Sequence, residues 1–129
     1  MIDTSKSYKS LSNREKGKIL EDLVSDVLSD FSCLGYTVLN NIRKSRGDQD
    51  HILIDHPNRE IYVFEDKNLN SDFVIYSNWL DSHILSRFND LPEIVTNFIG
   101  KGYKLIKVLI ISKFRVANHS IAETIRKHK

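Results

Sequence analysis

Two short apolar segments, about 50–55 and 61–67, constrain the fold of this chain more than any other feature. Each is only long enough for one strand, and each carries charge at one end. The residues between them, 56–59, have good turn chemistry, because Pro57 restricts one backbone dihedral angle. The two segments are therefore expected to form a hairpin of adjacent strands.

Charged side chains stand at the same end of both expected strands. Asp50 opens the first, and Glu65 and Lys67 close the second. Since side chains alternate along a strand, Glu65 and Lys67 should share one face while Asp66 points away. Carboxylates on neighbouring strands, with a lysine beside them, suit a hard divalent cation and phosphodiester chemistry. Asp48 lies on the same side of its strand as Asp50 and is an alternative metal ligand.

Hydrophobic periodicity places the hairpin within an α/β chain. A first helix is predicted from Ser12, through the capping box formed with Glu15, to about Phe31, and Gly35 ends it. The later elements are three strands, two helices, a strand and a last helix. They are a strand at 36–42, the hairpin, a helix around 79–88, a helix capped at Asp90 and ending at Gly100 or Gly102, a strand at 105–112 and a helix at 118–127. The apolar run at 105–112 is predicted to be central and covered on both faces.

The first helix carries an apolar stripe with helical spacing. Its members are Ile19, Leu20, Leu23, Val24, Val27, Leu28 and Phe31. Glu21 lies at the edge of this stripe, where its carboxylate could face a neighbouring sheet. The lone cysteine, Cys33, cannot form an internal disulfide and is expected to be a small buried hydrophobe.

Length and composition favour a single domain over residues 1–129, with 1–11 as a flexible basic arm. Hydrophobic residues make up 40% of the chain and charged residues 28%, without a long apolar run or a leader-like segment. We therefore expect a soluble cytoplasmic or otherwise intracellular protein that does not associate with a membrane. The net charge is +2, with the basic residues concentrated towards both ends and the acidic ones in the middle. That distribution suits flanks that hold phosphates around a metal-binding centre.

Several motifs resemble those of the PD-(D/E)xK nuclease superfamily. The run at 50–54 followed by Glu65-Asp66-Lys67-Asn68 is similar to the nuclease-related domain. The stretch at 16–21, followed by Leu34-Gly35-Tyr36, resembles archaeal Holliday-junction resolvases. Where the superfamily carries Pro-Asp, this chain has Gln49-Asp50.

The resemblance implies a restriction-endonuclease-like α-β-β-β-α-β core, with a mixed central sheet flanked by helices and an added C-terminal helix. It implies a Mg²⁺- or Mn²⁺-dependent endonuclease that hydrolyses DNA and leaves a 5′ phosphate. Asp50, Glu65 and the backbone carbonyl of Asp66 would hold the metal, and Glu21 would join them. Lys67 would orient the attacking water or stabilise the transition state.

DNA, branched or duplex, is the expected partner, with RNA as an alternative. The basic residues expected to contact phosphates are Arg43, Lys44, Arg46, Lys16 and Lys18. A Holliday-junction-resolvase-like specificity implies a homodimer, because a four-way junction has two-fold symmetry. The alternative function is a catalytically inert nucleic-acid-binding or assembly module of the same fold.

Overall fold

The computed structural model describes residues 12–68, 74–75, 77–112 and 115–116. In chain order the elements are α1 (Asn13–Ser32), β1 (Thr37–Arg43), β2 (Asp48–Asp55), β3 (Glu60–Asn68), β4 (Val74–Ile75), α2 (Ser77–His83), the 3₁₀-helix η2 (Leu85–Asn89), α3 (Glu93–Gly100), β5 (Lys104–Ser112) and β6 (Arg115–Val116). The basic arm at 1–11 and the helix predicted at 118–127 lie outside the described residues.

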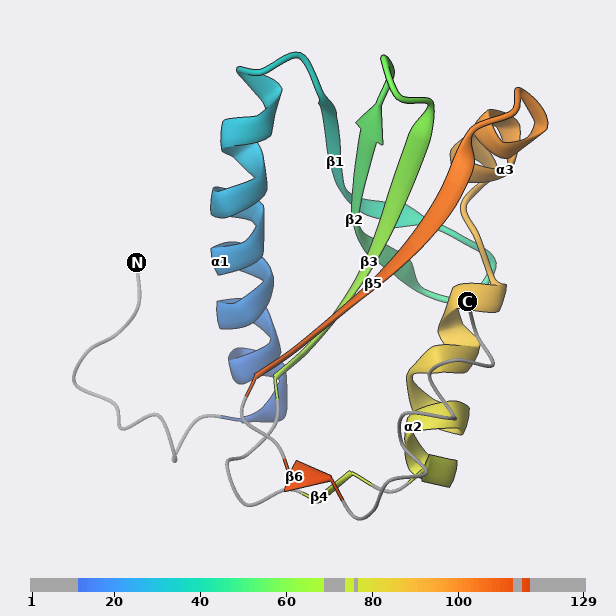
Figure 1. Ribbon diagram of the computed structural model, residues 1–129. Helices are drawn as coiled ribbons and strands as arrows, with labels where there is room; N and C mark the ends of the chain where they lie inside the picture. The colour runs from blue at the N-terminus through green and yellow to red at the C-terminus, as the bar shows by residue number, and fades with distance from the viewer. Residues whose placement is uncertain (1–11, 69–73, 76, 113–114, 117–129) are drawn as a thin grey trace.

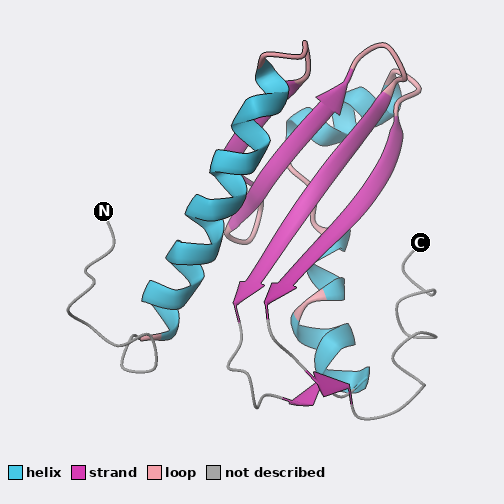
Figure 2. Cartoon of the chain, turned by 60° about the vertical axis from the view of Figure 1, so that its left-hand side comes forward, coloured by secondary structure: helices cyan, strands magenta, loops and turns pink. Residues whose placement is uncertain are grey.

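A four-stranded sheet lies between two helical layers (Figures 1 and 2). Its strand order is β1-β2-β3-β5, and β4 pairs with β6 separately. The first three strands are antiparallel and β5 is parallel to β3, so the sheet is mixed. Helix α1 covers one face, and α2, η2 and α3 lie on the other. The predicted α/β class and the order of the core elements are thereby confirmed. None of the described helices combines the length and the apolar character that crossing a bilayer requires.

Two apolar clusters hold the layers together. The larger joins the sheet to the α2, η2 and α3 layer and includes the buried side chains of Ile52, Val63 and Leu80. The smaller joins the sheet to α1 and includes Leu53 and Phe64. Residues on alternate positions of β2 and β3 thus enter different clusters, as the strand period requires.

Strand β5 lies at an edge of the described sheet, so its predicted central position was wrong. Helical layers nevertheless cover both of its faces. Leu109 and Ile111 pack on the larger cluster, while Val108 and Ile110 pack on the smaller. A continuous apolar run along a strand therefore indicates that side chains pack on both faces of that strand. It does not indicate whether the strand has a neighbouring strand on each side.

The predicted ends of α1 agree closely with the structure. The Glu15 amide donates to the Ser12 hydroxyl and the Ser12 amide to the Glu15 carboxylate, each at 3.1 Å, so the capping box is confirmed. The chain turns after Ser32, and Gly35 has a φ of 91°. Cys33 is the C-cap residue and is exposed, because it lies in this turn beyond the packed part of the helix. The prediction that it is buried was wrong.

The buried row of α1 is narrower than the predicted stripe. It repeats every four residues, at Lys16, Leu20, Val24 and Leu28. Leu23 and Val27 were predicted to pack inward, but 59% and 57% of their surfaces are exposed. The side chains of α1 that are fully buried therefore form a single i, i+4 row along the helix.

The segment predicted as one helix around 79–88 is divided in two. At Ile84 the backbone has φ −118° and ψ −64°, and the next turn winds as the 3₁₀-helix η2. Helix α3 begins at Glu93 after Pro92, without a side-chain cap. The capping role predicted for Asp90 was wrong, because its carboxylate binds the turn between β1 and β2 instead.

Candidate active site

Strands β2 and β3 separate where their charged ends meet. Their register ends at His51 and Phe64. Beyond that pair, Nε2 of Gln49 donates to the Phe64 carbonyl, and the Asp66 amide donates to Oδ2 of Asp50, each at 2.7 Å. Side chains therefore satisfy backbone groups that a continued ladder would have paired. The same bonds hold the Asp50 carboxylate between the two strands.

The charged end of β3 presents side chains to both faces of the sheet. Three in-register pairs with β5 define the directions: Glu65 with Leu109, Asp66 with Ile110 and Lys67 with Ile111. Leu109 and Ile111 pack on the larger cluster, whereas Ile110 packs on the smaller. Glu65 and Lys67 thus lie on the face of α2 and η2, and Asp66 lies on the face of α1.

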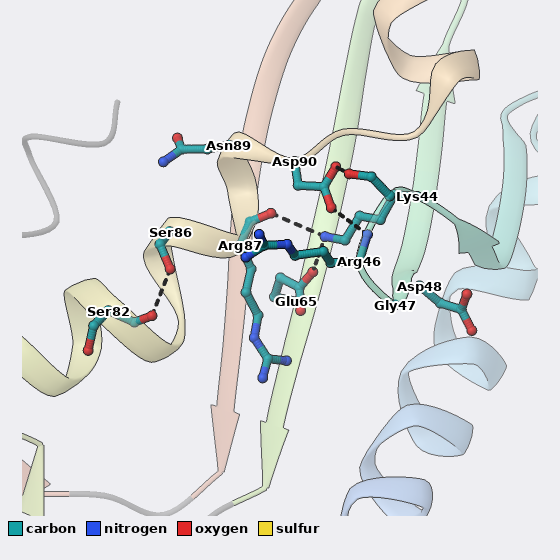
Figure 3. Close-up of a pocket in the computed structure, with 11 residues that line it drawn as sticks. Lys44, Arg46, Gly47, Asp48, Glu65, Ser82, Ser86, Arg87, Asn89 and Asp90 are labelled. Carbon is teal, nitrogen blue, oxygen red and sulfur yellow. Dashed lines mark hydrogen bonds and ion pairs between the residues drawn. The ribbon is translucent and has the colours of Figure 1, made fainter.

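Glu65 forms a buried ion pair with Lys44. The two side chains are 6% and 3% exposed, and Nζ of Lys44 lies 3.0 Å from Oε1 of Glu65. Nε2 of Gln49 donates to the same oxygen at 3.1 Å. Lys44, which was expected to face phosphates from a solvated loop, instead points inward (Figure 3). A charge that is buried in this way needs its partner to offset the loss of solvation.

A second polar group lies under α1. Nε2 of His51 contacts Oδ2 of Asp66, and Nδ1 of His51 lies 2.7 Å from Oδ1 of Asn40. Within the described residues, Oδ1 of Asp66 is buried without a hydrogen-bond partner. Burial first, and then the negative charge of Asp66, raises the pKa of Glu21. Glu21 is therefore electrostatically closest to the Asp66 and His51 side of the sheet.

Asp50 links the two polar groups electrostatically. Burial raises the pKa of Asp50 to about 7, against the opposing effect of the hydrogen bond from the Asp66 amide. The negative charges of Glu65, Asp66 and Glu21 raise it further. An added cation beside Asp50 would favour its charged form and so oppose the effects of burial and of the neighbouring carboxylates.

The alternative ligand, Asp48, lies in a different environment. It is exposed, and its Oδ1 lies 3.8 Å from Nη1 of Arg43. Asp50 is partly buried and bonded to β3. The structure thus brings Asp50, rather than Asp48, into contact with the residue that follows Glu65.

Carboxylates of this kind fit a hard divalent cation in their chemistry. Asp50, Glu65 and Asp66 offer oxygen ligands of the type that Mg²⁺ and Mn²⁺ prefer, including the unpartnered Oδ1 of Asp66. Across residues 12–68, 74–75, 77–112 and 115–116, however, no three His, Cys, Asp or Glu side chains converge as a metal-binding group. The side chains of Glu65 and Asp66 lie on opposite faces of the sheet, and Lys44 holds an oxygen of Glu65.

A pocket of about 720 Å³ opens beside Glu65, on the face opposite α1. The turn between β1 and β2 forms one wall, and polar side chains of α2 and η2 form another (Figure 3). The walls are tied together, because the Asp90 carboxylate accepts bonds from the Ser45 hydroxyl and, at 2.9 Å, from the Arg46 amide. Arg46 and Arg87 both line the pocket, and neither guanidinium has a partner within the described chain.

The five basic residues expected to contact phosphates are dispersed. Arg43, at the end of β1, and Arg46, on the pocket wall, are exposed, whereas Lys44 is buried. Lys16 is buried at the start of α1, and Lys18 pairs with Asp22 on the helix surface at 2.9 Å. Of these five, Arg46 is the one whose side chain lines the pocket beside Glu65 without a partner among the described residues, because Arg43 pairs with Asp48.

Sequence reasoning missed three residues of this site. The residues are Lys44 as the partner of Glu65, Gln49 as a bridge between the strands, and Arg87 on the pocket wall. The available signals were weak: Gln49 adjoins Asp50, and Lys44 stands in a turn beside the hairpin. Arg87 offered no signal, because nothing local relates η2 to β3.

The sequence model of the nuclease-related domain matches residues 16–121. Comparison with curated proteins and with solved structures gives no match. The matched range includes α1 from Lys16 onward, the complete four-stranded sheet and the pocket. The chain therefore belongs to the nuclease-related domain family.

Proposed function

We propose that this protein is a divalent-metal-dependent endonuclease that hydrolyses DNA phosphodiester bonds. One observation carries the proposal: the Asp50 carboxylate is held between two separated strands, and burial, followed by the charges of the neighbouring carboxylates, raises its pKa to about 7. Such an accumulation of negative charge is unfavourable in a purely structural site. Family membership supports the nuclease class.

Asp50 and Glu65 would hold the metal, together with the backbone carbonyl of Asp66, and Glu21 would bind at the margin of the site. The bound ion would acidify a water molecule and neutralise charge on the phosphate. Lys67 lies on the same face as Glu65 and would orient the water or stabilise the charged transition state. The amide of Asp66 keeps Asp50 directed between the strands.

The nucleic-acid strand would run along the pocket face of the sheet. Arg46 and Arg87 supply guanidiniums that have no partner among the described residues, and Arg43 lies at the end of β1. Guanidinium groups bind phosphate oxygens in pairs of parallel hydrogen bonds, so two of them can fix the path of one strand. Lys16 and Lys18, on α1, would lie away from that path.

Branched DNA is the substrate that the resolvase resemblance favours, and a homodimer would match its two-fold symmetry. Duplex DNA and RNA are the competing substrates. A panel of supercoiled plasmid, linear duplex, single strands, RNA and a synthetic four-way junction separates these cases. Light scattering with and without the junction measures the oligomeric state.

Cleavage by wild-type protein and by Glu65→Gln, in Mg²⁺, Mn²⁺ or EDTA, tests the proposal. Glu65→Gln keeps the shape of the side chain and should lower cleavage by roughly 100-fold or more, the effect of removing one key active-site group. Glu60→Gln is the matched control, because it makes the same change at the other end of β3. Cutting that persists in EDTA, or that survives in Glu65→Gln, would contradict the proposal.

The contact between Lys44 and Glu65 favours a second candidate, a nucleic-acid-binding module that does not cleave. A permanent ion pair at Glu65 would leave the metal without one of its carboxylates. This candidate predicts binding at low salt with no metal-dependent cutting of any substrate in the panel.

A further inference from the structure

The tight turn that carries Lys44 directs its side chain into the protein. The Lys44 amide donates to the Gly47 carbonyl at 3.1 Å, and Gly47 has a φ of 76°, which favours glycine. The side chain of Lys44 is only 3% exposed. The turn therefore places the Lys44 ammonium group beside the charged end of β3.

Three acceptors surround the Lys44 ammonium group. They are Oε1 of Glu65 at 3.0 Å, the Arg87 carbonyl at 3.1 Å and Oε1 of Gln49 at 3.3 Å. A lysine ammonium has three donors, so this one is fully satisfied. Only Glu65 is a charged acceptor, and it is the residue to which the proposed function assigns a metal.

Lys67 does not supply this charge. It shares a face with Glu65 through the register with β5, but it makes no ion pair or hydrogen bond within the described chain. Lys44 comes from 21 positions away and binds Glu65 directly. The cation that neutralises Glu65 is thus contributed by the turn and not by the Glu-x-Lys motif.

We propose that the Lys44 ammonium occupies the cation position of Glu65 and that a divalent ion must displace it. Lys44 would then be a positioning residue that sets the metal affinity of the site. This inference rests on the proposed function. The physical reason is competition: two cations repel each other strongly at one buried oxygen, so occupancy by one weakens the other.

Displacement of the Lys44 ammonium group from Glu65 would also change the contacts of the pocket wall. Lys44 holds the Arg87 carbonyl, and Asp90 holds the same turn through Ser45 and Arg46. When Lys44 leaves Glu65, the turn and η2 lose a shared bond at the wall where Arg87 stands. Metal binding and the pocket are therefore coupled through one side chain.

Chemical labelling of lysines tests the displacement in the unmodified protein. Reductive methylation followed by peptide mass spectrometry would compare Lys44 with and without saturating Mn²⁺. Lys44 should be protected without metal and should react roughly tenfold faster with it, in keeping with usual coupling strengths. Lys104, exposed at the far end of β5, is the control and should react equally in both. Protection of Lys44 that persists at saturating Mn²⁺ would overturn the inference.

Variants test the competition by calorimetric titration with Mn²⁺. Lys44→Met should bind the ion roughly tenfold more tightly than wild type, whereas Lys44→Arg keeps a cation and should not. Lys104→Met removes the same charge about 17 Å along the sheet, at 3.3 Å per residue, and should bind as wild type does. Should Lys44→Met fail to fold, the labelling result decides alone.

The outcomes separate this inference from the proposed function. Tighter binding in Lys44→Met without cleavage by any protein would support the inference and refute the nuclease. If metal-dependent cleavage is lost in Glu65→Gln while Lys44→Met binds Mn²⁺ with the wild-type affinity, the nuclease is supported and the inference is refuted. Absence of Mn²⁺ binding by both wild type and Lys44→Met would overturn the inference.

Discussion

The protonation of Asp50 should make stability depend on pH. Its folded-state pKa of about 7 lies above the ordinary 3.8, so the folded protein binds this proton more tightly than the unfolded chain does. Stability from this group is fully present below about pH 4 and is lost as the pH rises to about 7. Without metal, wild type should therefore lose stability relative to Asp50→Asn across that range. Urea unfolding of both proteins at several pH values measures the difference.

Asn at position 50 retains an oxygen that can accept the Asp66 amide, so the comparison isolates charge. Asp26→Asn, on the exposed surface of α1, serves as the control and should show no such trend against wild type. A stability difference between wild type and Asp50→Asn that stays constant with pH would refute the assignment.

At the scale of elements, the capping box at the start of α1 should stabilise the fold measurably. Ser12→Ala removes the acceptor for the Glu15 amide and should lower the free energy of unfolding by about 1 kcal/mol. Ser12→Asp supplies a carboxylate acceptor and should retain most of the stability. Urea midpoints compare the three proteins. Equal midpoints for Ser12→Ala and wild type would mean that the cap does not contribute to global stability.

The elements around the pocket form one connected unit. The turn after β1 binds η2 through Lys44 and the end of η2 through Asp90. The bonds from Ser45 and Arg46 to the Asp90 carboxylate explain why Asp90 does not cap α3. They also give Glu65 a fixed wall on the face opposite α1.

At the scale of the whole molecule, the net charge is only +2, and the pocket lining carries three basic and three acidic residues. Of the three basic residues, Lys44 is paired with Glu65, whereas the guanidinium groups of Arg46 and Arg87 have no partner among the described residues. Binding of single-stranded or duplex DNA should therefore depend on Arg46 and Arg87. Each substitution to alanine should weaken binding and reduce the slope of log affinity against log salt by about one. Fluorescence anisotropy in EDTA at several salt concentrations measures both quantities without cleavage.

Lys104→Ala removes an equal charge at the far end of β5 and should leave the slope near its wild-type value. Slopes that respond equally to Arg87→Ala and Lys104→Ala would indicate diffuse electrostatic attraction. The nucleic acid would then not follow the pocket face.

The sequence by itself determined the features that depend on local spacing. The alternation of side chains along β3 implied that Glu65 and Lys67 share a face of the sheet. The register between β3 and β5 places both residues on that face. The capping box and the order of the core elements followed from the same short-range rules. Such patterns are readable because a residue's neighbours within one turn or one strand determine its direction.

Only the tertiary structure decided which elements meet. The approach of Lys44 to Glu65, the opening of β2 from β3 at Asp50, and the edge position of β5 all join distant segments. The exposure of Leu23 has the same origin, because the way α1 lies on the sheet decides which row of the helix is buried. These contacts depend on turn paths and sheet twist, which sum over many residues and leave no local signature. The carboxylates could therefore be found in the sequence, but the lysine that holds one of them could not.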